Sequence, residues 1–353
     1  MKNILRSLTC TLVLVAGYFT TNAQDPHFDQ YYTFASYLNP ALVGNYDGSY
    51  RIAALYRQQW TSSLGQSNGF RTIGADADVS LLEGYLKHSR LALGVGFLDD
   101  RSGEAGLNYL SANLTLAYHQ GFGKDGAHRL SIGLQGGYIQ KTIDNAIYSS
   151  QHIIDNFGTP PLVSGEQPYK AVQNGDLNAG LYWKSNFHDV IRFGIGVAGY
   201  HLLQPKESLF ASNTNFGNLY RKISLDANLE GFFGKGRHNS LSPEVLFLQE
   251  GPAREITPGL LYSYHFQTGF RKNNSVSLGV RYRYSFGGGI GDAIIPMAEA
   301  EFRNIRLGFA YDVNVSALNA TTSYRGAFEL GLSFTGESIK SFKGSRSLPS
   351  RRF

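Results

Sequence analysis

Apolar and polar residues alternate along this chain with a period of two. The pattern is clearest between residues 107 and 120, where one set of alternate positions is Leu110, Ala112, Leu114, Leu116 and Tyr118 and the other is Ser111, Asn113, Thr115, Ala117 and His119. A period of two is typical of a β-strand with two different faces. About fourteen such segments, with no helical period between them, predict an all-β transmembrane antiparallel β-barrel of the outer-membrane type.

The expected strands follow one another to the end of the chain. They cover residues 49–60, 70–80, 90–98, 107–120, 128–141, 175–184, 191–201, 220–233, 241–249, 256–266, 275–286, 293–302, 305–313 and 325–335. Charged residues share one face of a strand, as Asp76 and Asp78 do between the apolar positions of residues 73–79. A Lys or Arg near the bilayer midplane would cost roughly 2–4 kcal/mol, so we expect the charged face to line the lumen.

The connections between these strands alternate in length. The long ones include residues 142–174, 202–219 and 314–324, and the short ones include residues 121–127, 185–190, 234–240 and 303–304. Bacterial barrels have short periplasmic turns and longer outside loops. The alternation therefore predicts an even number of strands, with the N and C termini both periplasmic.

Trp and Tyr residues near the expected strand ends fit aromatic girdles at the two membrane interfaces. They are Trp60, Tyr118, Tyr138, Trp183, Tyr282 and Tyr284. Aromatic residues are also common in strands of any kind, which is the alternative explanation.

The first 23 residues have the pattern of a secretory signal peptide. Lys2 and Arg6 precede an apolar run over residues 8–19, and small and polar residues follow up to Ala23. The run is too short to span a membrane as a helix. We therefore expect a periplasmic lead-in at residues 24–47, the outer-membrane barrel at residues 48–335 and a basic periplasmic tail at residues 336–353.

The formal net charge of +5 does not come from the barrel. The signal peptide contributes two positive charges and residues 336–353 a net four, which leaves residues 24–335 with a net charge of −1. A nearly neutral body does not indicate a nucleic-acid partner. The tail can meet lipid phosphates or an acidic periplasmic partner, or it can be disordered.

The sequence contains only weak signs of a catalytic or metal-binding site. Cys10 lies in the signal peptide, and the nine His residues lack the paired spacing of a zinc site. Ser263 and His265 share one strand face, as a nucleophile and its base would, but no third group is evident. Residues 121–126 formally match a dinucleotide fingerprint, yet a strand rather than a helix follows. We expect no catalytic, metal-binding or cofactor-binding residues.

Acidic and basic residues on the luminal faces form a candidate charge network. Its members are Asp76, Asp78, Arg281, Arg283, Glu299 and Glu301. Such residues can fill a barrel with paired charges, or they can line a pathway for a solute. Their mixed sign argues against a simple ion-selective ring.

Residues 24–60 read QDPHFDQYYTFASYLNPALVGNYDGSYRIAALYRQQW. This segment resembles the start of the PorP/SprF family of type IX secretion system membrane proteins of Bacteroidetes. The matching positions supply the candidate family-motif and partner-binding residues, namely Asp25, Pro26, Phe28, Gln30, Tyr31, Asn39, Pro40, Gly44, Arg57 and Trp60. Asp29 stands where Ser is common in relatives.

The resemblance implies a non-enzymatic component of the outer membrane of a Gram-negative bacterium, one that helps to secrete or anchor specific cell-surface proteins such as gliding adhesins. The implied partners are outer-membrane lipid, type IX secretion components, and a secreted adhesin or the C-terminal domain of a cargo protein. An outer-membrane porin or substrate-specific channel is the alternative that the barrel pattern leaves open.

The lead-in is too apolar for a free tail, and Pro26 and Pro40 interrupt any continuous helix or strand in it. We expect it to fold into or under the periplasmic mouth, with Asp47 and Arg57 among its polar anchors. The Pro-containing connection at residues 142–174 can cap the pore, meet a surface adhesin, or be an ordinary variable loop.

Overall fold

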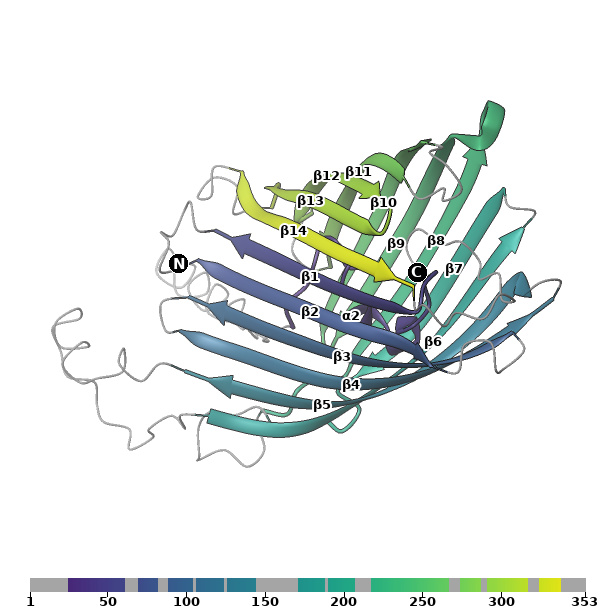
Figure 1. Ribbon diagram of the computed structural model, residues 1–353. Coiled ribbons are helices and arrows are strands. Elements are labelled where there is room, and N and C mark those ends of the chain that lie inside the picture. Colours follow the sequence, from purple (N-terminus) through teal and green to yellow (C-terminus); the bar gives the residue numbers. More distant parts are fainter. Residues whose placement is uncertain are drawn as a thin grey trace, which may run out of the picture.

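Fourteen strands form one closed antiparallel sheet in the computed structural model (Figure 1). The structure describes residues 25–60, 69–81, 88–103, 106–123, 126–143, 171–187, 190–206, 217–266, 274–286, 291–316 and 324–337. The strands are β1 (Tyr50–Gln59), β2 (Phe70–Leu81), β3 (Ser89–Ser102), β4 (Leu107–Phe122), β5 (His128–Thr142), β6 (Ala171–Phe187), β7 (Ile191–Tyr200), β8 (Lys222–Phe233), β9 (Asn239–Glu250), β10 (Ala253–Phe266), β11 (Asn274–Ser285), β12 (Ala293–Phe302), β13 (Ile305–Asn314) and β14 (Arg325–Gly336). The predicted barrel class and strand number are confirmed.

The barrel closes between its first and last strands. β1 pairs with β14 from Tyr50↔Gly336 to Gln59↔Ala327, and it also pairs with β2 along its whole length. Each remaining strand pairs with its neighbours in sequence. Closure leaves no edge among the described strands, so every strand has hydrogen-bonding partners on both sides.

Most differences between expected and observed strands are extensions. β6 begins at Ala171 and β10 at Ala253, several residues earlier than the alternation indicated. The added part of β6 continues the ladder with β5 as far as Thr142↔Ala171. Strand pairing, rather than apolar alternation, therefore decides where these strands begin.

The two faces of the strands meet different surroundings. On β4, Leu114 and Leu116 expose 56% and 49% of their surface, whereas Thr115 and Ala117 between them are buried. The exposed apolar residues point outward and form the surface that lipid solvates. The alternation of apolar and polar residues along the strand thus separates a lipid-facing face from a luminal face.

The barrel has two different ends. The short-connection end, where β1 begins and β14 finishes, carries residues 123–127 and 303–304, and the long-connection end carries residues 143–170 and 201–221. Two connections depart from the pattern at the long-connection end, where residues 103–106 join β3 to β4 and residues 251–252 join β9 to β10.

Exposed aromatic side chains of the expected girdles lie near both ends. Tyr118 and Trp183 lie towards the short-connection end, and Tyr138 and Tyr282 towards the long-connection end. All four point outward, where an interfacial residue has to be.

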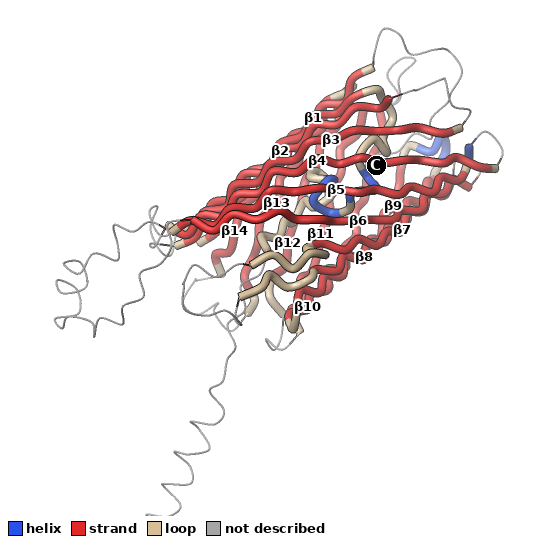
Figure 2. The backbone as a smooth tube through the Cα atoms, turned by 90° about the horizontal axis from the view of Figure 1, so that it is seen from below, coloured by secondary structure: helices blue, strands red, loops and turns tan. Residues whose placement is uncertain are grey.

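Residues 25–49, named the luminal segment from here on, lie inside the barrel. Figure 2 shows its short helices, α2 (Ala35–Leu38) and η1 (Pro40–Leu42), among the surrounding strands. A separate 3-10 turn, η4 (Lys235–Arg237), joins β8 to β9. One buried apolar cluster combines the segment with the barrel wall and contains Tyr31, Tyr32, Ala35, Leu38, Ala41, Leu42, Tyr182 and Leu246. The core of this protein is therefore the contact between the segment and the wall.

None of the helices in the described residues has the length and apolar character needed to cross a membrane.

Candidate functional site

The luminal segment runs lengthwise through the barrel. At its start, the Asp25 backbone N–H donates to Glu250 Oε2 (2.9 Å), and Lys222 Nζ donates to the Asp25 carboxylate (2.7 Å). Lys222 begins β8 and Glu250 ends β9, so both lie at the long-connection end. Further along, the Gly44 N–H donates to Asp78 Oδ2 (3.0 Å), close to the short-connection end.

The path of the segment corrects the expected position of the termini. The described chain starts near the long-connection end and finishes after β14 at the short-connection end. In the described residues the two ends lie at opposite ends of the barrel, which differs from the expected placement of both termini on one side. The reason is that the segment, which was expected to fold into or under one mouth, enters the barrel and crosses the whole lumen before β1 begins.

A buried cluster of charges fixes an early part of the luminal segment, towards the long-connection end. Arg57 pairs with Asp29, and it also pairs with Asp312 (2.8 Å) and Glu329 (3.4 Å). Arg283 donates to Asp29 (2.8 Å) and Asp312 (2.6 Å). Burial raises the pKa of Asp29 to about 6, against the opposing effect of the Arg57 and Arg283 charges. Residues of the segment and of four strands thus share one charge cluster.

A second cluster holds the start of the segment. His201 lies between two carboxylates, with Nδ1 2.9 Å from Asp176 and Nε2 2.9 Å from Asp25. Burial lowers the pKa of His201, but the charge of Asp25 and the hydrogen bonds to Asp25 and Asp176 outweigh it and raise the value to about 9. Burial also raises the pKa of Asp25, yet Lys222 and His201 hold it well below its usual range.

Polar contacts of the same kind hold the last part of the segment. Arg51 pairs with Asp76 (3.4 Å) and Asp78 (3.2 Å). Arg90 donates to the Gly44 and Tyr46 carbonyl oxygens, at 3.1 and 2.8 Å. The predicted luminal carboxylates of β2 therefore bind both the wall and the segment.

Glycines on the barrel wall make room for the segment. A side chain at Gly133 of β5 would overlap the carbonyl group of Pro40, and one at Gly180 of β6 would overlap the Asn39 side chain. Asn39 in turn donates to the Leu181 carbonyl oxygen (3.0 Å) and caps η1 by accepting the Ala41 N–H (2.9 Å). The turn η1 is seated in a notch that only glycine leaves open.

The candidate motif residues of the segment face the barrel wall or pack on one another. The Gln30 N–H donates to Glu329 Oε1 (2.6 Å), and the Arg281 guanidinium lies 4.1 Å from the centre of the Tyr31 ring. Tyr37 donates its hydroxyl to the Pro26 carbonyl oxygen (2.7 Å), and Phe28 packs edge-on against Tyr37.

Trp60 is the exception among the motif residues. It lies just after β1 with a positive φ of 59° and packs edge-on against Phe70. The other matched positions, from Asp25 to Arg57, hold the segment to the barrel. Most of them are buried inside the barrel.

Most residues of the predicted charge network pair with residues outside the predicted set. Asp76 and Asp78 pair with Arg51, Arg281 pairs with Glu244 (2.6 Å), and Glu301 pairs with Arg306 (3.1 Å). The register of β11 and β12 explains why the two arginines and the two glutamates are not direct cross-strand neighbours. Glu299 and Glu301 lie opposite Ser277 and Ser275, whereas Arg281 and Arg283 lie opposite Ile295 and Ala293. Glu299 does line a small cavity together with Arg281 and Arg306.

Ser263 and His265, the pair considered as a nucleophile and its base, each contact another residue. Ser263 shares a hydrogen bond with Ser277 (2.7 Å), while His265 Nε2 contacts Ser240 (2.8 Å). Within the described residues, no group of three or more His, Cys, Asp or Glu side chains could hold a metal ion. Gly123 and Gly126 have positive φ in the connection from β4 to β5, as a turn requires.

Some expectations lie outside the described residues. They are the signal peptide at residues 1–23, most of the connection at residues 142–174, and the tail beyond residue 337.

Sequence reasoning did not single out Asp29, His201, Glu250 and Asp312 as site residues. Alternation along β9 and β13 could have placed Glu250 and Asp312 on the luminal face, and Asp29 was already a departure from the family pattern. Their pairing with Asp25, Arg57 and Arg283 depends on the path of the luminal segment, which no periodicity reveals.

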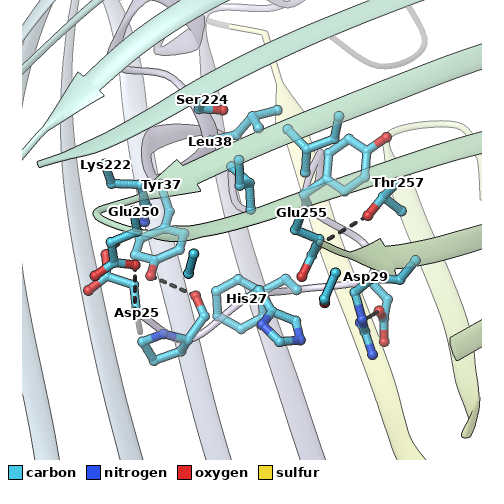
Figure 3. A pocket seen from close by; sticks show the side chains of 18 of the residues that line it. Asp25, His27, Asp29, Tyr37, Leu38, Lys222, Ser224, Glu250, Glu255 and Thr257 are labelled. Carbon is cyan, nitrogen blue, oxygen red and sulfur yellow. Dashed lines mark hydrogen bonds and ion pairs between the residues drawn. The ribbon is translucent and has the colours of Figure 1, made fainter. Parts of the chain in front are cut away.

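A pocket lies between the start of the luminal segment and strands β8 to β11 at the long-connection end (Figure 3). It encloses about 810 Å³, including space open to solvent. Apolar residues such as Phe28, Leu38 and Leu248 form part of its lining, and Glu250 and Glu255 contribute carboxylates. Its lining therefore offers both an apolar surface and hydrogen-bond acceptors.

Solved structures with a similar fold include two toluene transporters. The Ralstonia pickettii toluene transporter TbuX has a TM-score of 0.50 at 10% identity, over 86% of this chain and 93% of that one. The P. putida toluene transporter TodX has a TM-score of 0.45 at 9% identity, over 86% and 94% of the two chains. The first likeness supports the fold alone, and the second carries no further weight.

Among curated proteins, none matches this chain. The model of one family, described as type IX secretion system membrane protein PorP/SprF, matches residues 20–334. That match covers the luminal segment and nearly the whole closed barrel. The chain therefore belongs to the PorP/SprF family of type IX secretion system membrane proteins.

Proposed function

We propose that this protein is a non-enzymatic accessory component of the type IX secretion system that helps to secrete or anchor specific cell-surface proteins, such as gliding adhesins. Membership of the PorP/SprF family supports the link to secretion. In this proposal its partners are other secretion components and a secreted adhesin or the C-terminal domain of a cargo protein. In this proposal the long connections and the tail bind them, because the motif residues of the segment are engaged inside the barrel.

The single observation that carries an interaction role is the occupied lumen. The luminal segment fills it through an apolar cluster, two buried charge clusters and the glycine notch at Gly133 and Gly180. An open porin keeps a water-filled channel through its barrel. A segment held this firmly supports a closed scaffold over a passive pore.

The lengths of the connections support an orientation. Short turns of bacterial barrels face the periplasm and longer loops face outward. In this orientation the tail is periplasmic, and the start of the luminal segment lies near the outer mouth. A periplasmic tail would be positioned to meet secretion components, while the long connections would meet the cargo.

Conductance and partner capture together test the proposal. The mature protein and a variant that lacks residues 25–44 would each be measured in planar bilayers and used for pull-down from native outer membranes with mass spectrometry. We expect little conductance from the mature protein and co-purification of secretion or adhesin components. We expect the deletion to lose stability or partner binding. A stable open channel with no such partner would instead support the substrate-specific channel.

A further inference from the structure

The pocket at the long-connection end contains buried polar atoms that nothing in the described residues satisfies. They are Glu250 Oε1, Ser224 Oγ and His27 Nε2. Glu250 is 7% exposed and Ser224 is 1% exposed, and both residues line the pocket. A buried polar atom without a hydrogen-bond partner destabilises a fold, so three of them in one cavity indicate a site for a hydrogen-bonding group.

The register of the wall brings these groups together. Lys222 is the cross-strand neighbour of Glu250, and Ser224 is the neighbour of Leu248. On the other side, Leu248 is the neighbour of Glu255. The wall thus presents a leucine flanked by a hydroxyl and a carboxylate, with a second carboxylate one row nearer the mouth. Figure 3 shows Ser224, Glu250 and Glu255 around one space, with His27 and Leu38 from the segment.

The charges around Glu250 leave one carboxylate in surplus. Arg254 and Arg283 also line the pocket, and Arg283 is paired with Asp29, Asp292 and Asp312. Beside Glu250 itself, Lys222 and protonated His201 face three acidic groups, Asp25, Asp176 and Glu250. Both cations are bonded to Asp25, and Glu250 accepts only a backbone N–H. Glu255, on the next strand, accepts the Thr257 hydroxyl. A cation at this point would neutralise the surplus, whereas an anionic ligand would add to it.

We propose that this pocket binds a primary ammonium group carried on a short apolar chain, as in an alkylamine or a lysine side chain. The ammonium donates to Glu250 Oε1 and to Ser224 Oγ, and the chain packs against Leu38, Leu246 and Leu248, which line the same pocket. A neutral hydrocarbon would leave the carboxylate unpaired, and a quaternary ammonium has no N–H to donate. This site goes beyond the proposed secretion role and does not depend on it.

A ligand series on the mature protein in lipid nanodiscs tests the proposal. Hexylammonium, hexanol, hexanoate and hexyltrimethylammonium would each compete against a diazirine-bearing pentylammonium probe, with labelled residues located by mass spectrometry. We expect labelling within β8 to β10 and residues 25–38, and competition by hexylammonium alone. Equal competition by hexanol, or labelling elsewhere in the barrel, would overturn the proposal without affecting the conductance and pull-down results.

Two further experiments identify the carboxylate that binds the ammonium group and the kind of molecule that carries it. Glu250→Gln keeps the shape of the side chain and an acceptor for the Asp25 N–H, and we expect it to weaken hexylammonium binding roughly tenfold or more. Glu301→Gln, a luminal glutamate paired with Arg306, is the control and should bind normally. Unchanged binding by folded Glu250→Gln contradicts the proposal, and if that variant does not fold, the ligand series on the unaltered protein still decides it. An acetylated Gly-Gly-Lys-Gly-Gly amide, compared with its norleucine counterpart, distinguishes a lysine side chain from a free amine.

Discussion

Arg283 on β11 donates a hydrogen bond of 2.8 Å to Asp29, a residue 254 positions earlier in the chain. Both side chains are almost completely buried. Through this contact and the pairing of Asp29 with Arg57, the luminal segment is bonded to strands from both halves of the barrel. The segment is therefore an integral part of the fold.

Removing Arg283 should destabilise the barrel severely. Arg283→Ala leaves Asp29 and Asp312 with one cation fewer in a buried site, and breaking such a pair typically costs about 3–5 kcal/mol. Urea unfolding in lipid vesicles, followed by tryptophan fluorescence, measures the loss. Arg101→Ala is the control, because the Arg101 side chain is 59% exposed and 3.6 Å from Asp99, and it should change stability by less than about 0.5 kcal/mol. Equal losses in the two variants would show that the buried cluster has no special role.

Filling the glycine notch should displace the luminal segment. In Gly133→Val the new side chain overlaps Pro40, and overpacking of this kind costs about 1–3 kcal/mol. We expect faster protease cleavage within residues 25–49 and a higher conductance in planar bilayers. Gly136→Val lies on the same strand, with no atom within 4 Å of an added Cβ, and should behave like the unaltered protein. A Gly133→Val protein whose segment stays protected would contradict the seating of η1 in this notch.

Replacing Asp226 by Asn should stabilise the protein. Asp226 is 2% exposed, and neither carboxylate oxygen has a hydrogen-bond partner in the described residues. The amide keeps the shape and removes a charge that burial disfavours, with an expected gain of about 1–3 kcal/mol near neutral pH. Asp176→Asn is the opposite case, because Asp176 contacts His201 at 2.9 Å, and it should lower stability. A loss of stability in Asp226→Asn would reveal a function for the carboxylate that outweighs its burial.

His201 should make stability fall as the pH rises above neutrality. Its pKa in the folded protein is about 9, above the ordinary value of 6.5, so the folded state holds a proton that the unfolded state releases more readily. The stabilisation is complete below pH about 6.5 and is lost as the pH rises through about 9, with a total on the order of 3 kcal/mol. Unfolding free energies between pH 6 and 10 should show this loss in the unaltered protein and not in His201→Asn. Parallel pH profiles for the two proteins would mean that His201 is not charged in the fold.

Local sequence determined the barrel class, the number of strands and the face that each side chain takes. These follow from a period of two, which depends only on the backbone geometry of a strand, as Leu114 to Ala117 show on β4. The residues that resemble the PorP/SprF family at the N-terminal end were also visible in the sequence, and the family match over residues 20–334 agrees with them.

Tertiary structure decided what those residues do and which charges meet. Alternation places Arg281, Arg283, Glu299 and Glu301 on luminal faces, but the register of β11 and β12 sets each of them opposite another residue. The course of the luminal segment brings Asp29 to Arg283 and Asp25 to Lys222. The physical reason is that an irregular segment has no period of its own. Its path follows from the apolar surface, the glycine notch and the buried charges of a wall that exists only once the barrel has closed.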